Sequence, residues 1–205
     1  MSGKFSSVYL WRCTSCGSKH YGKNPPFNCK KCGLESNRFI LIPPGNIEIN
    51  FNMPRLNNIL YLVGSILDKK ANAMCCSSVT QLTFSPPLIA ASINKNTLTH
   101  DFVKERGTFS ICLLGRNQSE MAHYFGRNSG RQIDKFESYT YRLSNTGNPF
   151  VEGCPGYFDC KVDHQATVEL DTHTVFVGEI LDAEVGSMEA PLTYLDYQKE
   201  MCMVH

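Results

Sequence analysis

The sequence lacks any apolar run that could cross a membrane and any excess of charge of one sign. No stretch approaches the roughly 18 consecutive apolar residues that a spanning helix needs, and residues 1–5 lack the apolar core of a secretory signal. Lys and Arg number 20 against 19 Asp and Glu, a net charge of +1, which argues against nucleic-acid binding driven by bulk electrostatics. We therefore expect a cytoplasmic protein with neither a membrane nor a nucleic-acid partner.

Three catalytic signatures are also missing. The chain has no G-x-G-x-x-G of a dinucleotide-binding fold, no G-x-x-x-x-G-K-[ST] phosphate loop and no G-x-S-x-G nucleophile elbow. A hydrophobic fraction of 42% in 205 residues is nonetheless enough for a packed core. The length suits one medium domain, or one domain plus a small module.

Cysteine is the residue type present in unexpected number, with ten in the chain. A secreted disulfide scaffold would be shorter and would carry a signal, so a reducing compartment fits better. Four cysteines lie close together near the N-terminus, and the other six are scattered and are interpreted as small packing residues: Cys75, Cys76, Cys112, Cys154, Cys160 and Cys202.

The four clustered cysteines form two Cys-x-x-Cys-Gly units, Cys13 to Gly17 and Cys29 to Gly33. Each glycine allows the positive φ that lets a tight turn direct backbone amides at sulfur. Two such units favour a tetrahedral metal site over a redox dithiol, and a segment this small needs a metal to fold. The predicted ligands are Cys13, Cys16, Cys29 and Cys32; spacing alone does not separate zinc from a single iron.

The near-neutral total charge conceals two unlike parts. Residues 1–40 hold seven basic side chains and one acid, a net +6, which leaves −5 on the remainder. Solubility around a thiolate cluster explains this basic head, and a patch for docking a partner is the alternative.

Residues 8–40 resemble the short rubredoxin-like domain at the end of rubrerythrins. The resemblance rests on the two knuckles, on the run Gly22-Lys-Asn-Pro-Pro26 between them and on Phe39 after them. It implies one redox-active iron on four cysteines, with structural zinc as the alternative. The second knuckle reads Cys-Lys-Lys-Cys, where the family usually has proline after the first cysteine. His20 is expected to be a loop residue, because four cysteines already complete the shell.

Consecutive prolines in the run from Phe39 to Gly45 end this module. We predict domains at residues 1–42 and 46–205. The second domain is mainly β with some α: short strands, a turn at residues 68–70, and helices at residues 98–106 and 119–125. Thr97 is a plausible N-cap and Gly107 a stop for the first helix. Many strands with few helices suggest a closed antiparallel barrel with peripheral helices. The strands are expected at residues 60–67, 88–93, 109–114, 157–170 and 174–185.

Polar residues gather at three places in this domain. Residues 72–80 are small and hydroxyl-rich, and could face a planar ligand or be an ordinary strand. Residues 94–100 lie where a strand meets a helix N-terminus, which could bind phosphate or be simply capped. Residues 129–136 form a basic, Gly-containing turn that could supply another phosphate ligand.

In this order the segments resemble the flavin reductase-like FMN-binding split barrel, over residues 50–198. The matching runs start at Asn72, Phe84, Asn94, Phe125 and Thr172, and the last is Pro-Leu-Thr-Tyr at residues 191–194. The most similar branch is that of flavoredoxins and rubredoxin-fused flavin reductases. The resemblance implies an FMN-binding split β-barrel, with FMN at a homodimer interface.

The resemblance also assigns roles to residues. Lys95, Thr99 and Lys135 would hold the phosphate, His173 would be the catalytic residue near the point where hydride arrives, and Tyr194 would cover the ring. The complete FMN set that it implies is Asn72, Ser77, Ser78, Val79, Thr80, Asn94, Lys95, Thr99, His100, Ser129, Lys135, His173 and Tyr194.

These parts predict an electron-transfer oxidoreductase. Electrons would pass between NAD(P)H or a reduced partner, FMN and the iron, and then to a redox partner protein or small acceptor. One alternative is an NAD(P)H:flavin reductase with a zinc-stabilised interaction module. Another is a flavin-binding protein with no catalytic turnover.

Overall fold

The computed structural model describes residues 9–33, 35–36, 39–42 and 56–202. The chain divides into two compact units, Met1–Arg55 and Leu56–His205. The residues between the two predicted domains, 43–45, lie outside the described residues. Within the described part of the chain, no helix is long and apolar enough to cross a membrane.

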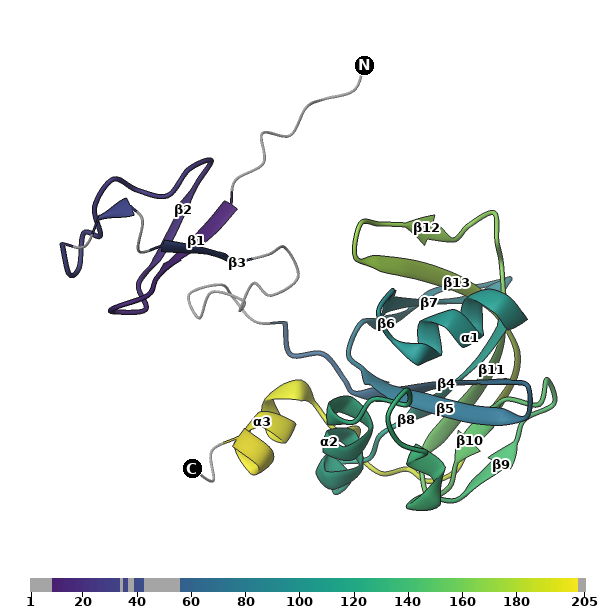
Figure 1. The fold of residues 1–205 in the computed structure, drawn as a ribbon. Helices are drawn as coiled ribbons and strands as arrows, with labels where there is room; N and C mark the ends of the chain where they lie inside the picture. The colour runs from purple at the N-terminus through teal and green to yellow at the C-terminus, as the bar shows by residue number, and fades with distance from the viewer. Residues whose placement is uncertain (1–8, 34, 37–38, 43–55, 203–205) are drawn as a thin grey trace. The chain divides into compact units, whose positions relative to one another are not determined.

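The N-terminal unit is a three-stranded antiparallel sheet in the order β2-β1-β3 (Figure 1). Its small interior contains Leu10, two of the clustered cysteines and Phe39, with Trp11 packed against them. So little buried apolar surface cannot hold a fold by itself. The strands are β1 (Tyr9–Cys13), β2 (Lys19–Gly22) and β3 (Phe39–Ile42).

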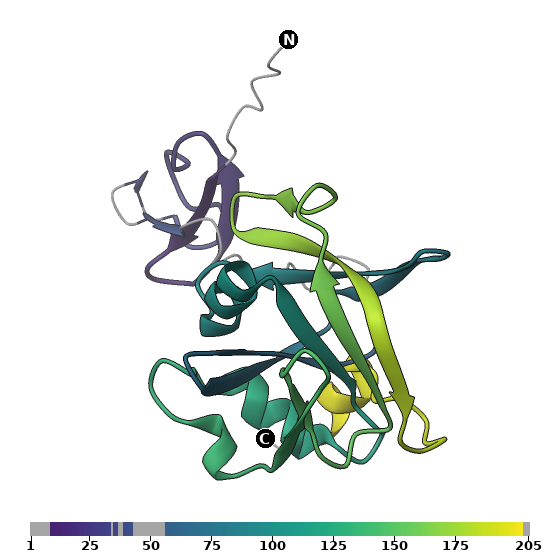
Figure 2. The ribbon, with the colours of Figure 1, turned by 90° about the vertical axis from the view of Figure 1, so that its right-hand side faces the viewer.

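The C-terminal unit is built on one antiparallel sheet in the order β5-β4-β8-β11-β13-β7-β6, with β12 paired to β13 (Figure 2). A separate hairpin pairs β9 with β10. The long strands are β4 (Tyr61–Leu67), β5 (Lys70–Cys76), β6 (Val79–Phe84), β7 (Pro87–Asn94), β8 (Thr108–Leu113), β11 (Gly156–Val162) and β13 (His173–Val185). The short ones are β9 (Tyr141–Leu143), β10 (Pro149–Val151) and β12 (Val168–Glu169).

The sheet rolls into a barrel that stays split. β5 and β6 stand at opposite ends of the strand order, yet only Ser77 and Ser78 connect them in the chain. This connection lets the two strand ends stand at most about 11 Å apart, so the sheet must curl until its two edges approach each other. No strand pairing joins β5 to β6 in the described unit, so the closed barrel suggested by the strand pattern is wrong and the split barrel is confirmed.

Turn chemistry explains two strand boundaries. Asp68 and Lys69 both adopt positive φ, 48° and 67°, between β4 and β5, which matches the expected turn and the twist that two-residue hairpins require. The single strand expected over residues 157–170 is wrong. The Asp163 side chain accepts hydrogen bonds from the backbone amides of Gln165 and Ala166, and this local turn ends β11.

Three helices lie on the barrel: α1 (Leu98–Arg106), α2 (Ser119–Arg127) and α3 (Tyr194–Cys202). α1 is capped by Thr97 and stops at Gly107, as expected. It packs against β4, while α2 packs against β5 and carries α3 on its other side (Figure 1). Helix α3 was not predicted from the sequence, and α2 ends at Arg127, past the end expected at residue 125.

Most of the scattered cysteines belong to the core. Two apolar clusters fill the barrel, one around Phe125 and Phe150 and the other around Phe109 and Phe176. Four cysteines within them are at least 94% buried, as expected of packing residues: Cys76, Cys112, Cys154 and Cys160.

Candidate functional site

A cavity of about 230 Å³ opens on the C-terminal unit between four segments. Its walls come from β5, from the turn leading into α1, from the end of α2, and from residues 128–135. The residues that carry the following argument are Asn72, Thr97, Thr99, Phe125, Gly130 and Lys135.

One wall is fixed by a buried hydrogen bond between β5 and α1. The Asn72 side chain donates to the Thr99 hydroxyl at 2.7 Å, and these residues are 3% and 0% exposed. Gly130 lies directly against this pair, since a Cβ there would stand 2.0 Å from Asn72 Oδ1. Only glycine lets residues 128–135 approach so closely.

Lys135 places a buried ammonium group in the cavity wall. The residue is 3% exposed, and its Nζ donates to the backbone carbonyls of Ala73 at 2.8 Å and Phe125 at 2.9 Å. Burial lowers the pKa of Lys135 to about 8. Because an ammonium has three donors, one remains for a ligand.

The first turn of α1 lies beside this ammonium. Thr97 caps the helix by accepting from the His100 amide at 3.2 Å, and residues 96–99 line the cavity. A helix N-terminus favours an anion through its unpaired amides and its dipole. Together, the helix start and Lys135 make the cavity suited to a phosphate group.

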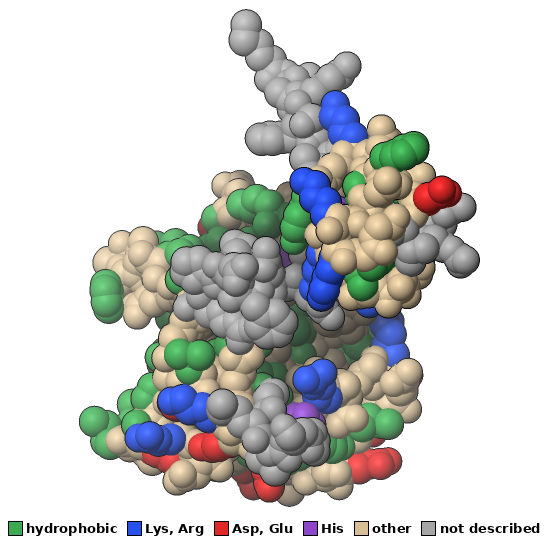
Figure 3. All heavy atoms as spheres, turned by 90° about the vertical axis from the view of Figure 1, so that its left-hand side faces the viewer, with side chains coloured by type: hydrophobic (Ala, Val, Ile, Leu, Met, Phe, Trp, Pro, Cys, Tyr) green, Lys and Arg blue, Asp and Glu red, His purple; other side chains and the backbone are tan. Residues whose placement is uncertain are grey.

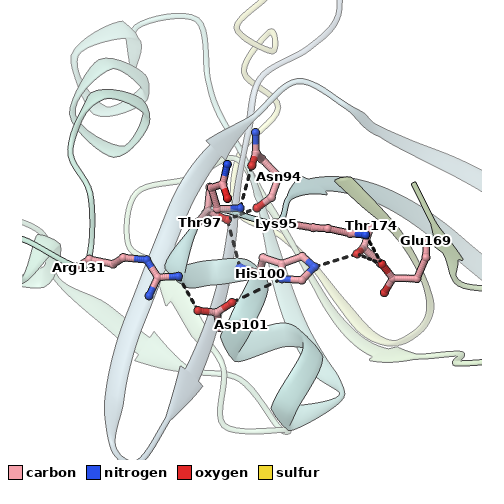
Figure 4. A network of polar contacts seen from close by, with 9 residues as sticks. Asn94, Lys95, Thr97, His100, Asp101, Arg131, Glu169 and Thr174 are labelled. Atoms are coloured by element: carbon pink, nitrogen blue, oxygen red, sulfur yellow. Dashed lines mark hydrogen bonds and ion pairs between the residues drawn. The ribbon is translucent and has the colours of Figure 1, made fainter. Parts of the chain in front are cut away.

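Lys95 and His100, which were expected at the phosphate or the flavin, do not line the cavity. Lys95 contacts Glu169 at 2.7 Å and the Leu170 carbonyl at 2.5 Å. The His100 ring turns toward β13, where Nε2 lies 2.8 Å from the Thr174 hydroxyl (Figure 4). Neither side chain is part of the cavity wall.

The polar network of Figure 4 holds the outer side of α1. Thr174 donates to Glu169, and the neighbouring Asp101 pairs with Arg131 at 2.6 Å. Burial is the main cause that lowers the pKa of His100. The neutral ring then serves packing and hydrogen bonding inside the unit.

The other expected residues divide between the cavity and its surroundings. Ser129 lines the cavity, whereas Asn94 accepts from the Asn96 amide in the preceding turn. His173 starts β13 opposite Asn94, half-buried, and Tyr194 starts α3 and packs on the barrel core. None of these last three is in the cavity wall. Ser77, Ser78, Val79 and Thr80 follow β5 at the split of the barrel, half-buried or exposed, also outside that wall.

Several residues that line the cavity were not predicted from the sequence. Thr97 was recognised only as a helix cap, and Gly126 only as part of the run that matches the family from residue 125, yet both line the cavity. The sequence offers one signal for this wall, because Gly126 and Gly130 flank the polar residues 127–129. Phe125 and Arg127 belong to the run that matches the family from residue 125, but no role was assigned to them, and Asn128 carried no signal of its own.

The four N-terminal cysteines converge as the two knuckles predict. Their Sγ atoms all lie within 4.8 Å of one another, with Cys13–Cys32 at 3.6 Å and Cys16–Cys29 at 3.5 Å. A tetrahedral ion with metal–sulfur bonds of about 2.3 Å needs sulfurs about 3.8 Å apart, so the set fits a single metal ion. The glycines after the knuckles, Gly17 and Gly33, have the expected φ of 69° and 75°.

Polar groups beside the cluster favour thiolates. The Ser18 hydroxyl lies 3.1 Å from Cys29 Sγ. This hydrogen bond is the main cause that lowers the pKa of Cys29 to about 5, and the backbone amides of Cys32 and Lys31 add to it. A deprotonated sulfur is the form that binds a metal.

Residues 53–204 match the family model described as flavin reductase like domain. The chain belongs to the flavin reductase-like family. Among curated relatives it is 34% identical over 142 residues to the high molecular weight rubredoxin of Moorella thermoacetica, covering 68% of this chain and 61% of that protein. It is 36% identical over 140 residues to the ferric-chelate reductase (NAD(P)H) of Archaeoglobus fulgidus, covering 67% and 82%. The match thus spans less than two thirds of the rubredoxin relative.

Among solved structures, the flavoredoxin of Methanosarcina acetivorans superposes with a TM-score of 0.61 at 28% identity, covering 68% of this chain and 74% of that one. The expected family resemblance and fold class are confirmed. These relatives are named as a rubredoxin, a ferric-chelate reductase (NAD(P)H) and a flavoredoxin, and the four-cysteine cluster is consistent with a rubredoxin-like knuckle.

Proposed function

We propose that this chain is a cytoplasmic flavin-dependent oxidoreductase that moves electrons between NAD(P)H or a reduced partner, FMN and a four-cysteine iron. One observation supports it above the others: a flavin reductase-like unit with an anion-suited cavity and a four-sulfur cluster occur in one chain. The relatives named a ferric-chelate reductase (NAD(P)H) and a rubredoxin are consistent with both halves.

The cavity fits the phosphate end of a flavin better than a whole flavin. Its volume of about 230 Å³ lies below the roughly 300–1,000 Å³ usual for pockets that enclose a small ligand. The ring would therefore lie outside it, and we assign it to residues 77–80 at the barrel split. FMN, whose phosphate is terminal, suits this small cavity better than FAD.

A bound flavin would supply hydride acceptance and single-electron release. The chain's residues hold and orient it. Lys135 and the α1 N-terminus would bind the phosphate, and Asn72 with Thr99 would keep the wall rigid. His173 is retained as the proposed residue near the hydride position, although it lies outside the cavity wall.

The metal is assigned as iron because the module resembles rubrerythrin-type knuckles. A zinc-stabilised module on an NAD(P)H:flavin reductase is the second candidate, favoured by the Cys-Lys-Lys-Cys departure in the second knuckle. Metal analysis of the purified chain and its visible spectrum separate the two.

Anaerobic mixing with NADH or NADPH tests the relay. We expect the flavin absorbance to bleach first and the iron absorbance to follow. Flavin that bleaches while the iron stays oxidised contradicts the relay. If neither nicotinamide bleaches the flavin, direct reduction is excluded and a protein donor takes its place.

Flavin occupancy tests the phosphate assignment. Thr99→Ala and Lys135→Ala should each purify with less flavin, whereas Lys161→Ala, an exposed lysine on β11, should retain it. Equal occupancy in all three variants contradicts the assignment.

We also propose a homodimer. Exposed apolar side chains on β6 and β13 support it, with Phe84 86% and Val185 80% exposed. Light scattering of the purified chain gives the mass, and a monomer at micromolar concentration contradicts it.

A further inference from the structure

The four sulfurs of the N-terminal cluster have unequal surroundings. Ser18 is half-buried beside one pair, with its Oγ 3.1 Å from Cys29 Sγ and 3.4 Å from Cys16 Sγ. Its backbone oxygen accepts from the Cys13 amide at 3.0 Å, so the residue is held in place by the knuckle itself.

A second polar group lies behind Ser18. His20 Nε2 is 3.0 Å from Ser18 Oγ and 3.8 Å from Cys29 Sγ. Its ring is oriented by an edge-on contact with Phe39, with centroids 5.1 Å apart at 84°. His20, which the sequence analysis treated as a loop residue, therefore has a fixed position next to the cluster.

Metal binding decides the direction of these hydrogen bonds. A metal-bound thiolate has no proton, so the Ser18 hydroxyl is the donor in its hydrogen bond to Cys29, the nearer of its two sulfur neighbours. The Ser18 oxygen is then left as an acceptor, and His20 Nε2–H is the donor beside it. Successive donors polarise one another, so the histidine strengthens the serine's hydrogen bond to sulfur.

We propose that Ser18 and His20 form a hydrogen-bonded relay that tunes the metal centre through Cys29. Donation to a thiolate withdraws electron density from sulfur and stabilises the more negative, reduced state of a bound iron. Ser18 and His20 are positioning residues here, because they act on the metal through its ligand. The relay rests on the proposed metal centre and adds to it that the Cys29 side controls its potential.

The test uses the full chain, stripped of metal and loaded with Co²⁺ alone. The sulfur-to-cobalt charge-transfer band reports how tightly sulfur holds its electrons. Ser18→Ala should move this band to longer wavelength, and Ser18→Thr, which keeps a hydroxyl, should restore it. Ser15→Ala is the matched control, since Ser15 is exposed in the same knuckle and should leave the band in place.

His20→Phe provides a variant that keeps both Ser18 and the ring contact with Phe39. It should shift the band in the same direction as Ser18→Ala, by a smaller amount. In the iron-loaded chain, Ser18→Ala should lower the reduction potential, measured by spectroelectrochemistry.

Two different failures are distinguishable. A wild-type chain that takes up neither Co²⁺ nor iron overturns the metal centre and the relay with it. A wild-type band that Ser18→Ala and His20→Phe leave unmoved overturns the relay alone. If Ser18→Ala does not load, His20→Phe decides: a shifted band supports the relay and an unshifted one overturns it.

Discussion

At the scale of single residues, the cavity depends on an absent side chain as much as on those present. Gly130 gives β5 room to place Asn72 and its hydrogen bond to Thr99 at the wall. A methyl group there must push residues 128–135 outward or break that bond.

Gly130→Ala should therefore lower flavin affinity at least about tenfold and the free energy of unfolding by about 1–3 kcal/mol, as overpacked sites do. Flavin titration and thermal unfolding measure the two effects. Gly156→Ala is the control, because a Cβ there has its nearest neighbour at an ordinary 3.7 Å. An unchanged affinity in Gly130→Ala would show that the Asn72 wall does not contribute to flavin binding.

Lys135 predicts a pH dependence of flavin binding. Its pKa in the fold is about 8, below the ordinary 10.5, so its charge and third donor are present below pH 8 and are lost above it. The neutral amine keeps two donors, enough for the two carbonyls but none for phosphate. FMN affinity should fall as pH rises from 8 toward 10, and Lys135→Met should bind weakly with a flat profile over that range. A wild-type profile as flat as the variant's contradicts this role.

The lowered pKa of Lys135 also makes the stability of the fold depend on pH. Because the unfolded chain holds this proton more tightly than the fold, the ligand-free protein gains stability as pH rises from about 8 to 10.5. Below pH 8 that contribution is absent.

At the scale of elements, the side chains at the start of α1 and in the turn before it point in two directions. Thr97 and Thr99 face the cavity, while Lys95 and His100 contact β12 and β13. Proximity in sequence to a phosphate-binding helix start therefore does not place a lysine at the phosphate.

Lys95→Ala should leave FMN affinity nearly unchanged, in contrast to Lys135→Ala. Its partner, Glu169, is half exposed, and such ion pairs contribute only about 0–1 kcal/mol. The expected effect is faster hydrogen exchange in β12, read by mass spectrometry of the variant. A tenfold loss of FMN affinity would restore Lys95 to the phosphate site.

How far the sequence predicts this protein depends on how local the signal is. The knuckles, the Thr97 cap and the turn at Asp68 are set by residues within a few positions, and all three were predicted. Long-range features were not: the Lys135 ammonium meets carbonyls 62 and 10 residues away, and no local pattern encodes those partners. Tyr194, expected to cover the flavin ring, packs on the barrel core at the start of α3, and its role stays a prediction.

At the scale of the whole molecule, the two compact units have very different means of support. The C-terminal unit has two apolar clusters, whereas the N-terminal unit has a few buried side chains around the cysteines and a basic surface (Figure 3). We therefore expect metal binding to contribute folding free energy to the N-terminal unit only.

Removing the metal with a strong chelator should unfold residues 9–42 and leave the barrel intact. Calorimetry should lose one transition and keep the other, and limited proteolysis should cut only the N-terminal unit. Cys32→Ser should behave like the stripped protein, and Cys160→Ser, a substitution in the barrel core, should lower the other transition instead. Loss of both transitions on chelation contradicts independent units.

The split between β5 and β6 has a mechanical consequence. Any other line drawn along the barrel crosses a ladder of paired strands, and opening it would break backbone hydrogen bonds. Widening the split breaks no strand ladder, and it is resisted only by side-chain packing, by the Cys76 thiol that donates to the Ser92 carbonyl, and by the two-residue link at one end. The barrel is therefore most compliant along the seam between β5 and β6, and a planar molecule could be admitted there by a small breathing motion without any loss of sheet structure.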